Sequence, residues 1–251
     1  MPQRFLHWPA LATAALLGAC AAGGAKVDAL LPADILLVGE QHDDAAHQRE
    51  HRDLVQALAG RGKLAAVAIE MAEQGTSTAG LPRDADESTV RASLAWDANA
   101  WPWQAYAPAV LAAVRAGVPV IGANLPRERL RAAMQDASLD TALDPEAVAR
   151  QREAIRVGHC DLLPASQLGP MARVQIARDR TMARVLEAAA VPGQTVMLLA
   201  GAGHVDPAIG VPRYLPPTLH VKELVLPRTP GAGQPDYCAK LREQLQRRSA
   251  S

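Results

Sequence analysis

Short runs of apolar and β-branched residues alternate along this chain with longer segments of helical periodicity. The first run, residues 34–39, ends in glycine, and residues 43–60 follow it with Leu54, Val55 and Leu58 on one helical stripe. The remaining segments of strand pattern are 64–69, 118–123, 195–200 and 219–226, and those of helix pattern are 106–116, 128–134, 147–156 and 171–190. This alternation predicts an α/β fold with a mainly parallel sheet covered by helices on both faces.

A polar stretch interrupts the alternation at residues 72–93, where Gly75, Gly80 and Pro82 occur. We expect it to form an excursion or a lid. No repeat, linker or low-complexity segment divides the rest. The pattern therefore indicates one domain over residues 20–251, with a helical excursion.

The first twenty residues have a different character. Arg4 provides a positive charge, residues 10–17 form an apolar run too short to span a bilayer, and Leu17-Gly18-Ala19-Cys20 follows. This is typical of a bacterial lipoprotein signal peptide, residues 1–19, with lipid attached to Cys20; an ordinary cleaved signal with an incidental cysteine is the alternative. Since Ala21 and Ala22, and not Asp, directly follow Cys20, we expect a protein anchored by lipid to the outer membrane, facing the periplasm or the cell surface.

Charge and cysteine content narrow the choice of partners. Lys and Arg number 26 and Asp and Glu 26 in 251 residues, so the chain lacks the basic excess that a nucleic-acid partner requires. Two cysteines, Cys160 and Cys238, remain after Cys20. In an oxidising periplasm they either pair and tie the C-terminal segment to the body, or stay as two free thiols.

Polar side chains follow four of the predicted strands. The strand ends carry Glu40 and His42, Glu70, Asn124 with Arg127, and His204. Since the carboxyl ends of parallel strands form the crevice in which ligands bind, these groups should converge, although each alone could be a capping or turn residue. Glu40, His42, Glu70 and His204 could hold a divalent metal, or act as the acid and base of a hydrolase.

Charged and imidazole side chains also occur on two predicted helices. His47 and His51 share the stripe of Leu54, so they either line the pocket and ligate iron or are partly exposed residues of the first turns. Asp43 and Asp44 are expected to cap that helix. On helix 171–190, Arg178 lies in the inward stripe; it forms an ion pair near the site or extends to the surface.

An ordered set of motifs resembles the ChaN-like haem-binding lipoproteins, whose wider relatives include the Tiki metalloproteases and the erythromycin esterases. The set is Ile35-Leu36-Leu37-Val38-Gly39-Glu40-Gln41-His42-Asp43-Asp44, Glu70-Met71, Trp101-Pro102-Trp103, Tyr106-Ala107-Pro108, Asn124-Leu125-Pro126-Arg127, Arg178-Asp179-Arg180-Thr181-Met182-Ala183 and Gly201-Ala202-Gly203-His204. It extends over residues 30–226. The resemblance implies a haem-binding protein of the periplasm or outer membrane, with haem held by a tyrosine and sandwiched at a homodimer interface. It also implies that haem is captured or stored for an uptake receptor or transporter.

Haem requires an apolar surface, an axial ligand and cations for its propionates. The phenols are Tyr106, Tyr214 and Tyr237, and Tyr106 is the first choice for a tyrosinate ligand because it adjoins Trp96, Trp101 and Trp103. Those tryptophans either form core or, with Trp103 foremost, contact the porphyrin. Tyr214 is the second choice, beside Arg213 for a propionate, and His47 or His204 is the alternative to a tyrosine. The sequence thus favours a binding protein over an enzyme, with the Glu/His hydrolase as the competing hypothesis.

Overall fold

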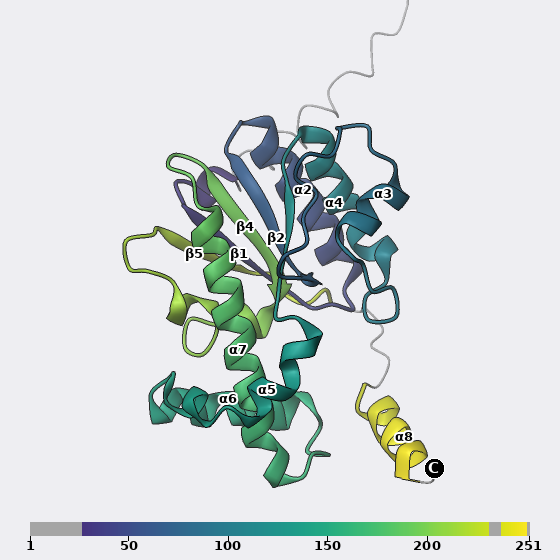
Figure 1. The fold of residues 1–251 in the computed structure, drawn as a ribbon, viewed down its shortest axis with the longest axis vertical. Coiled ribbons are helices and arrows are strands. Elements are labelled where there is room, and N and C mark those ends of the chain that lie inside the picture. The colour runs from purple at the N-terminus through teal and green to yellow at the C-terminus, as the bar shows by residue number, and fades with distance from the viewer. Residues whose placement is uncertain (1–26, 231–236, 250–251) are drawn as a thin grey trace, which may run out of the picture.

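A single sheet of five parallel strands forms the centre of the molecule (Figure 1). The computed structural model describes residues 27–230 and 237–249. The strand order is β3-β2-β4-β1-β5, and the strands are β1 Ile35–Glu40, β2 Leu64–Glu73, β3 Val120–Asn124, β4 Thr195–Gly201 and β5 Val221–Val225. The predicted α/β class with a parallel sheet is confirmed. β4, late in the chain, inserts between β1 and β2, so strands distant in sequence are neighbours at the centre.

Helices cover both faces of the sheet, α2 (Ala45–Gly60) and α4 (Trp103–Ala116) on one side and α7 (Ala165–Ala189) on the other. The other helices include α3 Glu87–Ser93, α5 Leu130–Gln135, α6 Pro145–Gly158 and α8 Tyr237–Ser249. The short 3-10 turns are η1 Arg127–Arg129, η2 Ala137–Thr141, η3 Ala202–Val205 and η4 Val211–Tyr214. Most of the predicted helices are present with shifted ends. The sequence pattern did not predict α3 and α8, and α7 begins before the predicted Met171.

The alternation of side chains along each strand divides the core into two layers. On β1, Leu36 and Val38 pack toward α2 and α4, whereas Ile35 and Leu37 pack toward α7. Because every second residue faces the same layer, a strand buried on both sides must be apolar throughout. A third apolar cluster joins α5, α6 and α7 beyond the end of the sheet, where α7 extends in Figure 1.

The polar segment 72–93 runs beside β3, at the edge of the sheet. Ser77 forms an isolated bridge with Ile121 of β3, and the Thr78 hydroxyl accepts a hydrogen bond from the Val120 amide at 2.8 Å. The excursion ends in α3, whose N-cap is Asp86; the Asp86 carboxylate accepts a hydrogen bond from the Thr89 amide. The segment is therefore tied to β3, and the expectation of a lid is not supported.

None of the helices within residues 27–230 and 237–249 combines the length and apolarity needed to cross a membrane. The predicted signal peptide and Cys20 lie outside the described residues.

Candidate functional site

The two buried carboxylates, Glu40 and Glu70, lie on opposite faces of the sheet, because alternate residues of a strand point to opposite sides. Glu40 ends β1 in phase with Val38, so its side chain points toward α2 and α4. Glu70 lies in β2 in phase with Ala66 and Ala68, so it points toward α7. Both are almost completely buried and must find partners in the protein.

Glu40 is held by a tyrosine and a histidine. The Tyr106 hydroxyl, from α4, donates to Glu40 Oε1 at 2.7 Å, and His42 Nδ1 lies 2.7 Å from the same oxygen. His51 Nδ1, from α2, is 3.7 Å from Glu40 Oε2. These contacts place three side chains from separate segments around one carboxylate.

Glu70 belongs to a charged cluster of four residues, which we define as Glu70, Arg178, Asp179 and His204. His204 Nε2 lies 3.4 Å and Arg178 Nη1 3.7 Å from Glu70 Oε1, and His204 Nδ1 lies 2.5 Å from Asp179 Oδ1. The Gly201 amide donates to Glu70 Oε2 at 2.8 Å. The cluster contains two acidic and two basic groups, so the charges can balance without an added ion.

The protonation states agree with this balance. Burial alone would raise the pKa of Glu70, but His204, His42 and Arg178 hold it far below its usual range. Burial would lower the pKa of His204, but the facing Glu70 and Asp179 carboxylates raise it to about 10. Burial raises the pKa of Asp179 to about 6 despite His204. At neutral pH the cluster therefore holds an imidazolium between two carboxylates.

His42 connects the two carboxylates across the sheet end. Its Nε2 is 3.8 Å from Glu70 Oε2, its ring packs edge-to-face on Trp101 at 4.8 Å, and its side chain is 39% exposed. Burial would lower the pKa of His42, yet the hydrogen bond to Glu40 and the charge of Glu70 raise it. The ring thus favours the protonated form and links Glu40 to the charged cluster.

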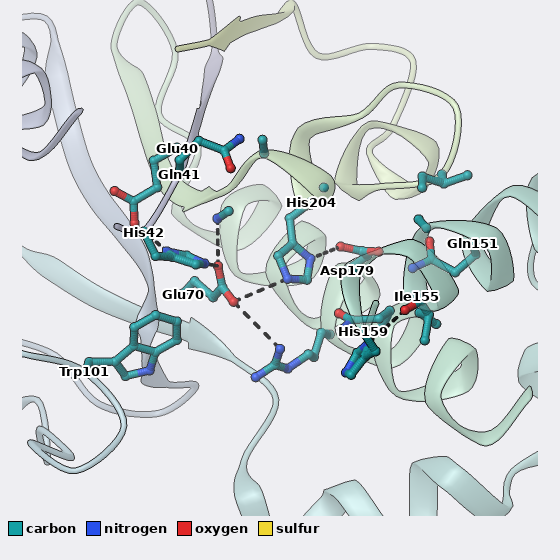
Figure 2. Close-up of a pocket in the computed structure, with 18 residues that line it drawn as sticks. Glu40, Gln41, His42, Glu70, Trp101, Gln151, Ile155, His159, Asp179 and His204 are labelled. Carbon is teal, nitrogen blue, oxygen red and sulfur yellow. Dashed lines mark hydrogen bonds and ion pairs between the residues drawn. The ribbon is translucent and has the colours of Figure 1, made fainter. Parts of the chain in front are cut away.

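A cavity of about 440 Å³ opens beside this network, between the strand ends and helices α6 and α7 (Figure 2). We call it the main cavity. Apolar side chains, three imidazoles, three carboxylates, three amides and one guanidinium contribute to its wall; among the residues that line it are Glu40, Gln41, His42, Glu70, Trp101, Gln151, Ala154, Ile155, His159, Gln175, Arg178, Asp179, His204 and Ile209. Figure 2 shows His42, Glu70 and His204 on the sheet side and His159 and Gln151 on the side of α6.

The donor set does not form a metal site as it stands. Within the described ranges, no group of three or more His, Cys, Asp or Glu side chains has an arrangement that could hold a metal ion. Arg178 and protonated His204 already lie where a cation would compensate Glu70. The prediction of a divalent metal on Glu40, His42, Glu70 and His204 is therefore not supported by this geometry.

Both phenols considered as haem ligands have buried hydroxyl groups. Tyr106 is 2% exposed, and burial together with Glu40 raises its pKa well above the ordinary value. The Tyr214 hydroxyl is buried without a hydrogen-bond partner in the described part of the chain, and burial raises its pKa as well. Neither residue lines the main cavity. This placement does not support a tyrosinate at either position, and the side chain of Tyr237 lies outside the description.

Three further residues predicted to bind haem also lie away from the main cavity. His47 is buried, where its Nε2 donates to the Pro227 carbonyl at 2.9 Å and its Nδ1 accepts from the Gln41 amide. Trp103 is buried against Trp96. Arg213 donates to Asp144 on the surface. Each is occupied by a structural contact, and Trp101 is the tryptophan that reaches the cavity.

The predicted convergence at the strand ends is otherwise present. Asn124 Nδ2 donates to the Glu70 carbonyl at 2.8 Å, and Arg127 donates to Asp97. Both line a smaller cavity of about 200 Å³ that shares Glu70, Trp101 and Arg178 with the main cavity. Asp44 caps α2 as expected, by accepting from the Ala46 amide.

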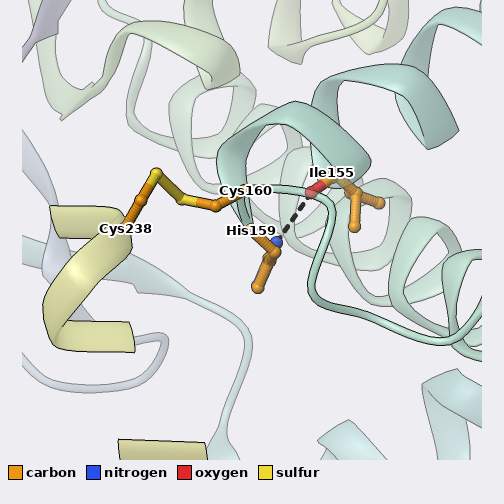
Figure 3. Close-up of a disulfide and its surroundings, with 4 residues drawn as sticks. All are labelled: Ile155, His159, Cys160 and Cys238. Carbon is orange, nitrogen blue, oxygen red and sulfur yellow. Dashed lines mark hydrogen bonds between the residues drawn. A yellow bond between two sulfur atoms is a disulfide. The ribbon is translucent and has the colours of Figure 1, made fainter. Parts of the chain in front are cut away.

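The wall contributed by α6 was not predicted from the sequence. Gln151, Ile155 and His159 lie on one stripe of this helix and at its end, but nothing in the local sequence indicates that the stripe faces the strand ends. Cys160 follows His159 and forms a disulfide with Cys238 of α8 (Figure 3). Of the two alternatives for these cysteines, the disulfide is therefore the one that the structure contains. It joins the end of α6 to α8.

Comparison with known proteins agrees with this architecture. A family profile described as haem-binding uptake, Tiki superfamily, ChaN matches residues 27–215. A solved structure of ChaN of Campylobacter jejuni, described as showing cofacial heme binding, superposes with a TM-score of 0.66 at 23% identity, over 85% of this chain and 88% of that one. At this identity the superposition shows a shared fold. No curated protein matches the sequence.

Proposed function

Because the chain belongs to the haem-binding uptake family of the Tiki superfamily that includes ChaN, we propose that it binds haem in the main cavity and serves haem uptake outside the cytoplasm. The observation that carries the proposal is the composition of the cavity wall. Trp101, Ile155 and Ile209 provide apolar surface, and imidazoles, carboxylates and a guanidinium lie beside them. Pockets that combine apolar walls with a few placed polar groups suit a porphyrin.

Haem would bring to such a cavity an iron that takes a ligand from the protein, and two propionate carboxylates that need cationic partners. Arg178 would be the cation for a propionate, because it is the guanidinium that lines the main cavity and its side chain is 24% exposed. Its Nη1 faces Glu70 at 3.7 Å, which fixes the guanidinium at the cavity wall. The charged cluster would then orient the group that receives the propionate.

The location that we propose is the outer membrane, with a lipid anchor at Cys20. The lipobox Leu17-Gly18-Ala19-Cys20 supports it, and so does the disulfide between Cys160 and Cys238, since such bonds persist in oxidising compartments. In this position the protein would capture or store haem and hand it to an uptake receptor or transporter. Two copies would meet with their haems face to face. The mass of the hemin complex would reveal the dimer.

The competing hydrolase has no structural observation in its favour. The charges of Glu70 and His204 neutralise each other within the charged cluster, and the main cavity is lined by no Ser, Thr or Cys that could serve as a nucleophile among the described residues. We therefore assign the Glu/His network a structural role beside the binding cavity.

The test is a hemin titration of the full chain with a variant that fills the cavity. Ala154 is exposed on α6 and lines the cavity, so Ala154→Trp should lower hemin affinity by about tenfold or more, since an indole would occupy the space of the porphyrin. Ala188→Trp, on an exposed position of α7 outside the main cavity, is the matched control and should bind as the wild type does. Absence of a saturable Soret change in the wild type, or equal affinity of the two variants, would reject the proposal.

A further inference from the structure

A second cavity, of about 540 Å³, lies where α5 packs on α7 (Figure 1). We call it the arginine cavity. Ala177 and Arg184 of α7 line it, whereas Gln175 and Asp179 of the same helix line the main cavity. Since an α-helix has about 3.6 residues per turn, these two pairs lie on opposite sides of α7. The two cavities are therefore separate and have no lining residue in common.

Three guanidinium groups line the arginine cavity. Arg129 comes from η1, and Arg180 and Arg184 come from α7. Among the described residues that line it, Asp136 is the one carboxylate. Hydrogen bonds from Ser138, together with the charge of Arg180, hold the pKa of Asp136 below its usual range, so it is ionised and offsets one guanidinium. The positive charges of the lining still outnumber the negative one.

These guanidinium groups have no acidic partner at ion-pair distance in the part of the chain that the structure describes. Other arginines of α7 do have one, since Arg173 pairs with Asp140 at 2.6 Å. Arg184 Nη2 donates instead to the Thr181 hydroxyl at 3.1 Å. Thr181 is fully buried, and its hydroxyl donates in turn to the Ala177 carbonyl at 2.8 Å. Arg184 is thus oriented at the cavity wall while its charge stays available.

The spacing of two of these arginines favours an anion between them. Arg180 and Arg184 are four residues apart, so they are neighbours on one face of α7, where like charges destabilise a helix. A bound anion removes that repulsion. The planar fork of a guanidinium matches the oxygens of a phosphate group, to which it donates two parallel hydrogen bonds.

The rest of the lining is suited to an organic group. Leu125, Ala133 and Leu139 are buried apolar residues of the arginine cavity. Apolar walls with a few placed polar groups are typical of sites for small molecules. A cavity of about 540 Å³ also leaves room for more than a single phosphate group.

We propose that the arginine cavity binds a phosphate ester. Arg129, Arg180 and Arg184 would hold the phosphate, and the apolar lining would contact the organic group. A soluble phosphate ester and the phosphate of a lipid headgroup share this chemistry. The proposal does not depend on haem in the main cavity, because the two sites lie on opposite sides of α7.

The experiment is a calorimetric titration of the full chain with phenyl phosphate. We expect saturable binding to the wild type, and Arg180→Gln and Arg184→Gln should each lower the affinity by about tenfold or more. Ala132→Trp, at an exposed position of α5 in the cavity lining, should weaken binding as well because the indole occupies the space. Arg115→Gln, which removes an exposed arginine of α4 outside the cavity, should bind as the wild type does.

A second titration, with the water-soluble lipid dihexanoylphosphatidylglycerol, identifies the source of the phosphate. Tighter binding of this lipid than of phenyl phosphate, lost in Arg180→Gln, supports the proposal with a lipid headgroup as the ligand. Tighter binding of phenyl phosphate supports it with a soluble ester.

Three results would overturn the proposal. The first is that neither probe binds the wild type saturably, and the second is that Arg180→Gln and Arg184→Gln, folded by circular dichroism, bind as Arg115→Gln does. The third is that hemin displaces phenyl phosphate from the wild type, because the arginine cavity would then belong to the haem site. A wild type that binds phenyl phosphate but no hemin would reject only the proposed function.

Discussion

At the scale of single residues, the buried charges of this protein are stable because they are arranged as a neutral set. An isolated carboxylate at the position of Glu70 would be too costly to desolvate. The imidazolium of His204 and the guanidinium of Arg178 compensate Glu70, and Asp179 compensates the imidazolium in turn. Removing one member leaves its neighbours uncompensated, so the cluster acts as a unit.

This arrangement predicts how stability depends on pH. The pKa of His204 is about 10 in the folded protein and about 6.5 in an unfolded chain, so its stabilising effect is complete below pH 6.5 and is lost as the pH rises toward 10. We expect the free energy of unfolding to fall by up to about 3 kcal/mol between pH 7 and 9.5. Urea denaturation at the two pH values measures the change.

The control variants identify the group responsible. His204→Gln should be less stable than the wild type at pH 7 but should lose less stability between the two pH values. His220→Gln, at an exposed position at the opposite end of the sheet, should retain the full loss. A wild-type midpoint that does not change with pH would show that His204 is neutral in the folded state.

At the scale of elements, the end of β1 is shaped by the turn that follows β4. Gly39 lies under η3, where an added Cβ would be 2.4 Å from Val205 Cγ2 and 3.1 Å from the Ala202 backbone. The close approach brings His204, within η3, against Glu70. A glycine at the end of β1 therefore contributes to the site without carrying any of its chemistry.

The variant Gly39→Ala tests this packing. We expect it to lower the free energy of unfolding by about 1–3 kcal/mol, because the methyl group forces β1 and η3 apart. Gly60→Ala is the matched control: nothing lies within 4 Å of its added Cβ, and alanine suits the end of α2 better than glycine. Equal urea midpoints for Gly39→Ala and the wild type would mean that η3 can shift without cost.

At the scale of the whole molecule, a disulfide ties the C-terminal helix to α6, and a lipid is proposed at Cys20. The Cys160–Cys238 disulfide closes a long loop between α6 and α8, and such a cross-link restricts the unfolded chain. At the N-terminus, the lipobox predicts that Cys20 receives lipid. The folded body would then be held at a membrane by acyl chains, with no spanning helix needed.

The proposed lipid anchor predicts that the variant Cys20→Ala changes its location in the cell. Cys20→Ala should move the protein from the detergent-soluble membrane fraction to the periplasmic extract, because it removes the thiol that accepts the lipid. The double variant Cys160→Ala with Cys238→Ala should remain in the membrane fraction, since it changes the other two cysteines and leaves Cys20. If Cys20→Ala fractionates like the wild type, the protein is not anchored through this residue.

The sequence by itself determined the layers of this protein and one wall of its site. Apolar runs of strand length predict a sheet buried on both faces. Polar residues after these runs, Glu40, Glu70 and His204, predict a cluster at one edge. These are local properties, since a strand end is marked by the residues that form it. The resemblance of the same motifs to the ChaN-like proteins predicted that the ligand is haem.

Only the tertiary structure decided which residues meet the cavity. Tyr106 is adjacent to tryptophans in sequence, but helix geometry turns its hydroxyl to Glu40 in the core. His159 carries no local signal, because its place in the wall depends on how α6 packs on α7 and on a disulfide to α8. Contacts between segments far apart in the chain are set by the packing of the whole molecule, which no local pattern encodes.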